Sequence, residues 1–238
     1  MAAPTDAPCS PACWTRWPEV SVRAPVNPRK LLTWLGLAVG AFAVILQFSL
    51  SMQAYAALGK DIPGSLGTFF AFYTILTNVV LVLIYLSEVT LVSWLAPFRH
   101  PVTRAMMAAN IALVMLYVHF VLRFLSVLDG LDQLADTMLH YLAPTLYMLW
   151  WLAAQRHGVL KWANLPIMLA PTLAYFAYIL ARGAWVNEYP YPVLAVNKIG
   201  YGAVLLNALY MMLALAVLTA IVIALDQLLA RLSRTAPV

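Results

Sequence analysis

The chain has 238 residues, of which 64% are hydrophobic and 10% charged, with a mean hydropathy of +0.85 and a net charge of +5. A soluble domain is on average about half apolar and about a quarter charged, so the composition argues against a large soluble protein. The modest positive charge requires no nucleic-acid partner, because it follows from the membrane topology predicted below.

The first thirty residues are polar and interrupted by prolines, and they show little periodicity. We expect residues 1–30 to form a disordered cytoplasmic tail. Cys9 and Cys13 lie in this tail without a nearby histidine, which favours free thiols over a metal site. No metal and no organic cofactor is predicted for the chain.

Long apolar stretches then recur to the end of the chain. A helix needs about twenty apolar residues to cross the hydrocarbon core. We therefore predict an all-α, polytopic membrane protein with a six-helix domain at 31–230 and a short basic tail at 231–238. The predicted spans are residues 31–55, 67–87, 104–128, 134–154, 160–181 and 199–229.

Lysine and arginine are distributed unequally between the two sides of this bundle. Ten of the 14 basic residues fall in the tails and in the loops that share their side. Cytoplasmic loops carry an excess of basic residues, so both termini are predicted to be cytoplasmic. Anionic head groups would add some attraction to these loops, which makes membrane lipids the expected surroundings and partners.

Two polar residues occupy matching depths in different spans. Counted from the predicted outer boundary, Thr74 lies ~10 Å deep and His140 ~9 Å deep at 1.5 Å per residue. Polar groups in hydrocarbon are costly and usually face a protein interior or a wet cavity. Residues at i and i+4 share a helix face, which stacks Thr74 over Asn78, Asp136 over His140 and His119 over Arg123. The other polar residues near this layer are Thr77, His119, Asn207, Arg123 and Arg182.

These residue types suit acyl-transfer chemistry. A histidine base can activate a threonine hydroxyl, and Asp136 or His119 would orient the ring of His140. Asn78 would donate a hydrogen bond to a developing oxyanion. For the substrate, Arg123 or Arg182 would hold a carboxylate, and Asn207 would add a polar contact.

Each of these residues also has a purely structural interpretation. Threonines in helices bond their own backbone carbonyls, which applies to Thr74 and Thr77 alike. Asn78 and Asn207 can hold helices together. Arginines near the boundary can extend towards head groups.

Several motifs in order along the chain resemble one known group of proteins. They are Phe72-Tyr73-Thr74-Ile75-Leu76-Thr77-Asn78, Leu139-His140-Tyr141-Leu142-Ala143-Pro144, Arg182-Gly183, Tyr189-Pro190-Tyr191-Pro192, Gly200-Tyr201 and Asn207. The set looks like the Pr6Pr family of bacterial six-span membrane proteins, over nearly everything after the tail. The resemblance implies a multi-pass protein of the bacterial inner (plasma) membrane.

The arrangement is more distantly similar to the androgen-induced gene product and the androgen-dependent TFPI-regulating protein of animals. These are multispan hydrolases that cleave fatty acid esters with an intramembrane threonine and histidine. The resemblance implies that His140 is the base and Thr74 the nucleophile, with Thr77 as a rival three residues on.

The expected function is therefore hydrolysis of a lipid or fatty acid ester near the outer leaflet by a Thr/His pair. A non-catalytic lipid-binding or assembly protein is the alternative that the sequence does not separate from an enzyme. A small-molecule transporter is a weaker alternative, because the inner halves of the spans carry few polar residues. The sequence leaves the substrate and the oligomeric state open.

Overall fold

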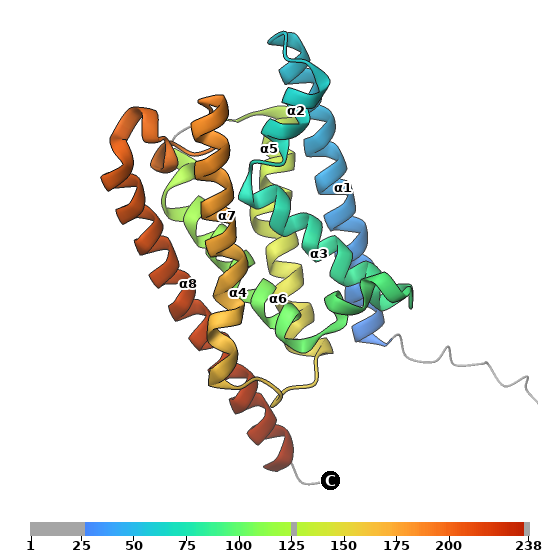
Figure 1. Ribbon diagram of the computed structural model, residues 1–238. Coiled ribbons are helices and arrows are strands. Elements are labelled where there is room, and N and C mark those ends of the chain that lie inside the picture. Colours follow the sequence, from blue (N-terminus) through green and yellow to red (C-terminus); the bar gives the residue numbers. More distant parts are fainter. Residues whose placement is uncertain (1–26, 125–127, 236–238) are drawn as a thin grey trace, which may run out of the picture.

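The computed structural model describes residues 27–124 and 128–235, and every regular element within these ranges is a helix (Figure 1). The all-α class predicted from the sequence is therefore confirmed. The predicted tail falls largely on residues 1–26, which lie outside the described residues, and the first helix begins within it at Pro28. The start of this helix and the end of the last one lie at the same end of the bundle (Figure 1).

Thirteen helical elements follow one another along the described chain. They are α1 (Pro28–Ala57), α2 (Ile62–Phe69), α3 (Tyr73–Val89), η2 (Ser93–Arg99), α4 (Pro101–Phe120), η3 (Leu122–Phe124), α5 (Gly130–Thr137), η4 (Met138–Leu142), α6 (Ala143–Ala154), η5 (Trp162–Asn164), α7 (Leu165–Val186), η6 (Pro192–Leu194) and α8 (Val196–Thr235). Of these, η4 is a single π-helical turn, and α8 is kinked at Gly200. Because α8 continues to Thr235, the basic tail predicted to start at 231 begins as helix.

Several helices are long and apolar enough to cross a membrane. Four pass this test alone, at Pro28–Ala57, Pro101–Phe124, Trp162–Val186 and Val196–Ser233. The pair α2 and α3 passes as one broken span, which brings the number to five. The chain is thus compatible with a membrane protein of four or five spanning helices.

The second predicted span is not the continuous helix that we expected. Its two halves, α2 and α3, are bent by 79° at the break between Phe69 and Tyr73. Phe72 adopts an extended conformation there, and the carbonyl of Ala71 accepts a hydrogen bond from the hydroxyl of Tyr175 on α7 (2.9 Å). Breaking a helix in an apolar environment frees backbone groups that must find partners, and Tyr175 supplies one.

The third predicted span, 104–128, is not one continuous α-helix either. Its helix α4 ends at Phe120, and Val121 leaves the helical conformation (φ −122°, ψ −60°). The predicted stacking of His119 over Arg123 on one helical face is therefore wrong, because Arg123 lies in the separate turn η3.

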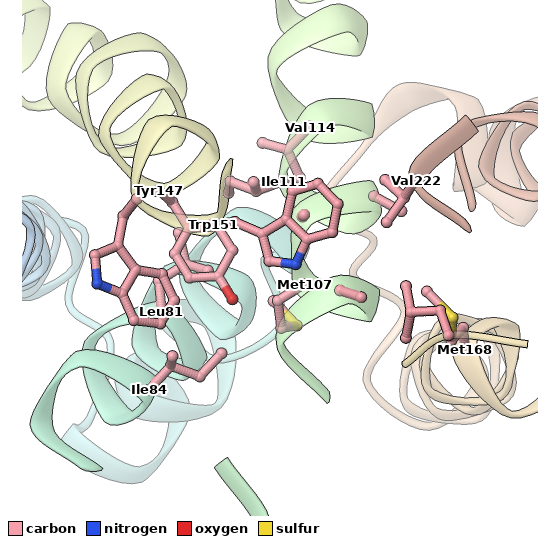
Figure 2. Close-up of a cluster of buried hydrophobic side chains, with 14 of the residues drawn as sticks. Leu81, Ile84, Met107, Ile111, Val114, Tyr147, Trp151, Met168 and Val222 are labelled. Carbon is pink, nitrogen blue, oxygen red and sulfur yellow. The ribbon is translucent and has the colours of Figure 1, made fainter. Parts of the chain in front are cut away.

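The core fills the centre of the bundle with aromatic and aliphatic side chains from α3, α4, α6, α7 and α8 (Figure 2). Tyr85, Tyr147 and Trp150 are almost completely buried there, with ring centroids 5.2–5.8 Å apart. Tyr85 packs so closely on α1 that a Cβ added to Gly36 would lie 2.2 Å from its ring. This packing fixes α1 against α3, the helix that carries Thr74.

Candidate functional site

Thr74 lies at the second position of α3, directly after the break in the span. The residue before the helix, Phe72, makes no side-chain capping bond, so the helix begins without a side-chain cap. The first N–H groups of a helix have no partner within the helix, and the helix dipole makes this end electropositive. The break therefore places Thr74 at the electropositive end of α3, where its own N–H donates to the Tyr191 hydroxyl (3.5 Å).

His140 lies in the π-helical turn η4, between α5 and α6. The turn precedes Pro144, whose ring would clash with the carbonyl of residue 140 in a regular α-helix and which lacks an N–H. A wider turn, in which the N–H of Ala143 bonds the carbonyl of Met138, accommodates this proline. Such π-turns often occur at functional sites.

Thr74, His140 and Asp136 form a chain of contacts. Thr74 Oγ1 lies 3.2 Å from His140 Nε2, which is the contact predicted from their matching depth. On the other side of the ring, His140 Nδ1 lies 2.8 Å from Asp136 Oδ1 and 3.0 Å from the backbone carbonyl of Asp136. Both neighbours of Nδ1 are acceptors, so the proton of a neutral ring belongs on Nδ1 and the lone pair on Nε2 faces the threonine.

This chain lines one cavity of about 500 Å³. Thr74 is 7% exposed, and the His140 side chain is 15% exposed, so both are accessible only through the cavity. The cavity is bounded by α1, the break between α2 and α3, α5 with η4, and the segment 190–192. The other polar side chains along its wall are Gln47, Ser51, Tyr55, Arg123, Asp132, Gln133, Thr137, Tyr141 and Tyr191.

Asn78 does not have the role of oxyanion donor that we expected. Its amide nitrogen donates to the carbonyl of Thr74 (2.9 Å) and to the carbonyl of Leu139 (3.2 Å). Both donor hydrogens are therefore used, and Asn78 is not among the cavity's lining residues. Because these carbonyls belong to α3 and to η4, the amide ties the segment of Thr74 to the segment of His140.

Thr77 follows the structural interpretation. Its hydroxyl lies 2.9 Å from the carbonyl of Tyr73 and 3.0 Å from that of Thr74, as is common for threonine in a helix. Thr77 also does not line the cavity. Of the two candidate nucleophiles, only Thr74 meets both the histidine and the open space.

Two other candidates, His119 and Asn207, lie apart from the Thr74–His140 contact. The ring of His119 packs against Phe120 and Tyr141, so Asp136 and not His119 contacts His140. The side-chain amide of Asn207 donates to the carbonyl of Val193 (2.9 Å). Both are structural contacts within the bundle, and neither residue lines the cavity.

Arg182 belongs to a separate polar cluster with Lys60, Thr68 and Glu188. Lys60 Nζ lies 2.7 Å and Arg182 Nη2 lies 3.7 Å from the Glu188 carboxylate. The hydrogen bond from Lys60 lowers the pKa of Glu188 below its usual range. Arg182 is thus engaged outside the Thr74 cavity, and of the two arginines only Arg123 lines that cavity.

Tyr191 lines the cavity although it lies between two predicted spans, where the depth of polar residues within the spans could not predict it. Its hydroxyl lies 3.5 Å from the backbone N–H of Thr74, a long contact at the start of α3, and the residue lines the cavity. Burial raises the pKa of Tyr191 above its usual range, so the phenol keeps its proton at neutral pH. The residue lies in a loop far along the chain, and only the Tyr189-Pro190-Tyr191-Pro192 motif drew attention to it.

Comparison of the chain with protein-family models, with curated proteins and with solved structures gave no match. Among the described residues, no group of three histidine, cysteine or acidic side chains is arranged to hold a metal ion.

Proposed function

We propose that the protein is a hydrolase of lipid esters in which Thr74 is the nucleophile and His140 its general base. The observation that carries the proposal is the contact chain from Thr74 Oγ1 through His140 to Asp136, on the wall of a cavity of about 500 Å³. Nucleophile, base and orienting group within hydrogen-bond reach are the arrangement that covalent acyl transfer requires. The resemblance to multispan threonine hydrolases points the same way.

The reaction would proceed in two balanced steps. Thr74 Oγ1 attacks the ester carbonyl carbon while its proton passes to His140 Nε2, and the bond from that carbon to the alcohol oxygen then breaks. The proton on Nε2 moves to the leaving alkoxide, and an acyl-threonine remains. A water molecule then repeats the sequence with His140 as base, which releases the acid and restores Thr74.

The oxyanion would form at the start of α3. The helix dipole favours negative charge there. The Tyr191 hydroxyl, which accepts from the Thr74 N–H at 3.5 Å, would turn its own proton towards the oxyanion. The helix start and the tyrosine thus take the role that the sequence suggested for Asn78.

In the membrane, the chain would form six spans with both termini in the cytoplasm. The additional span would be α5, η4 and α6, which follow one another from Gly130 to Ala154 without a non-helical residue. The excess of lysine and arginine on the side of the termini supports this orientation. The cavity would then open near the outer leaflet of the bacterial inner (plasma) membrane, where lipid substrates enter from the bilayer.

Labelling and turnover of the purified protein test the chemistry. A fluorophosphonate lipid probe should label the wild type, and both Thr74→Ala and His140→Ala should abolish labelling and ester hydrolysis while the protein stays folded. Thr77→Ala is the matched control and should keep most activity, because Thr77 does not face the cavity. Full labelling of the His140→Ala protein would refute the enzyme and leave lipid binding as the better account.

Cysteine accessibility tests the orientation separately. Single cysteines at Asp132 and His157 should react from the outside and from the cytoplasm, respectively. The reverse pattern would refute the orientation, and with it the position of the cavity near the outer leaflet.

A further inference from the structure

A second, narrow cavity meets the catalytic cavity at the nucleophile. It has a volume of about 50 Å³, against about 500 Å³ for the wide cavity that contains His140. Four residues line both spaces, and they are Thr74, Tyr191, Val118 and Leu122. Thr74 therefore stands between two spaces that differ tenfold in size.

The two cavities also differ in chemistry. Apart from the hydroxyls of Thr74, Thr172 and four tyrosines, the narrow cavity is lined by aliphatic and aromatic side chains of α4, η3, α7 and α8 together with Leu194. No charged residue lines it, whereas Arg123, Asp132 and Asp136 line the wide cavity. An apolar group is thus favoured in the narrow space, and a polar group in the wide one.

The position of the base decides which part of an ester enters which space. The histidine that takes the threonine proton must return it to the leaving alcohol, so the alcohol must lie on the side of His140. His140 lines the wide cavity only. The acyl group, bonded to the same carbonyl carbon, then points across Thr74 into the narrow cavity.

We propose that the substrates are esters of a short acyl chain with a larger, polar alcohol, the acyl chain lying in the narrow cavity and the alcohol in the wide one. This inference rests on the proposed hydrolase function. A water-sized group needs roughly 10–15 Å³ of cavity volume, so the narrow cavity holds on the order of four such groups. That is enough for a short acyl chain and too little for a long one.

Two residues mark the depth of the narrow cavity. Val114 lies one helical turn along α4 from Val118, which borders both cavities, and Val114 lines the narrow one alone. Its place on α4 at the edge of the core cluster is visible in Figure 2. Met211 reaches the same cavity from α8. A larger side chain at 114 should shorten the cavity, and a smaller one at 211 should lengthen it.

The test compares p-nitrophenyl butanoate, octanoate and hexadecanoate with purified wild type and variants. The wild type should prefer butanoate to hexadecanoate by roughly tenfold or more in kcat/KM. Val114→Phe should lower kcat/KM for butanoate roughly tenfold, while Met211→Ala should move the preference to octanoate. Val217→Phe is the matched control, because Val217 is exposed on α8 and lines neither cavity.

A second series tests the alcohol side. With the butanoyl group held constant, the glycerol monoester should be cleaved with higher kcat/KM than the methyl ester, because the larger alcohol makes contacts in the wide cavity. Equal rates for butanoate and hexadecanoate, or an unchanged chain-length profile in Met211→Ala, would refute the inference. If Thr74→Ala still abolished all turnover in that case, only the inference about the acyl chain would fail, and the hydrolase function would stand. Turnover that survived Thr74→Ala would refute the hydrolase function itself.

Discussion

Asp136 offers a quantitative test of how the base is held. Its carboxylate lies 2.8 Å from His140 Nδ1, and its own backbone carbonyl lies 3.0 Å from the same atom. Replacing Asp136 by alanine removes the first acceptor and keeps the second. The ring should therefore retain its orientation and tautomer, and the variant should lose only the stabilisation of the imidazolium by the carboxylate.

The size of that loss follows from the contact. A hydrogen bond to a charged group contributes about 1.5–3 kcal/mol. The Asp136 side chain is 34% exposed, and solvent screening favours the lower half of this range, about 1.5–2 kcal/mol. At 1.36 kcal/mol per factor of ten, kcat should fall roughly 10–30-fold in Asp136→Ala.

Steady-state hydrolysis of a p-nitrophenyl ester measures this effect. Asp136→Asn keeps a side-chain acceptor without the charge, and it should lose about as much kcat as Asp136→Ala. His140→Ala should lose nearly all activity, because residues that act as a unit fail with the first deletion. A loss in Asp136→Ala as large as in His140→Ala would refute the reasoning, since the backbone carbonyl would then not hold the ring.

Two further predictions concern stability in detergent. Gly36→Ala forces a methyl group to within 2.2 Å of the buried Tyr85 ring and should destabilise the fold by about 1–3 kcal/mol, whereas Gly202→Ala, with open space around it, should not lower the melting temperature. Lys60 lowers the pKa of Glu188 in the folded protein, so the ionised carboxylate stabilises the fold. This stabilisation is fully present above the pKa of Glu188 in the unfolded chain, and it is lost as the pH falls through the pKa in the folded protein. The melting temperature should therefore fall below about pH 4.5, and Lys60→Met should weaken this dependence; an identical acid dependence in both proteins would contradict the assignment.

Hydrophobic composition was enough to predict the all-α class and the approximate positions of the long helices. The same reasoning missed the break between α2 and α3, because residues 67–87 form one uninterrupted apolar stretch. The break depends on partners that are distant in sequence, such as the hydroxyl of Tyr175, which bonds the freed carbonyl of Ala71. A local pattern does not contain that information.

For the site, matching depth alone was enough to predict the contact between Thr74 and His140, and helical periodicity was enough to predict the contact between Asp136 and His140. Depth is only one coordinate, so it also selected residues on other faces of the bundle. Asn207 donates a hydrogen bond to the carbonyl of Val193 in η6, and Arg182 pairs with Glu188. Placing those side chains requires the rotation of each helix about its axis, and that rotation is set by packing in the core.

The two irregularities in the helices explain why residue 74 is chemically usable. In an uninterrupted helix through residues 62–89, the N–H of Thr74 would bond the carbonyl of Phe70, and no donor would face an anion. The break leaves this N–H to a partner outside the helix, the Tyr191 hydroxyl at 3.5 Å, and the π-turn accommodates Pro144 where His140 contacts Thr74 of α3. Irregular backbone in apolar surroundings is tolerated where it is buried in protein or lines a cavity, and residues of both irregular segments line the cavity here. Both departures from regular helix, which cost free energy in apolar surroundings, thus lie at the cavity in which the proposed chemistry occurs.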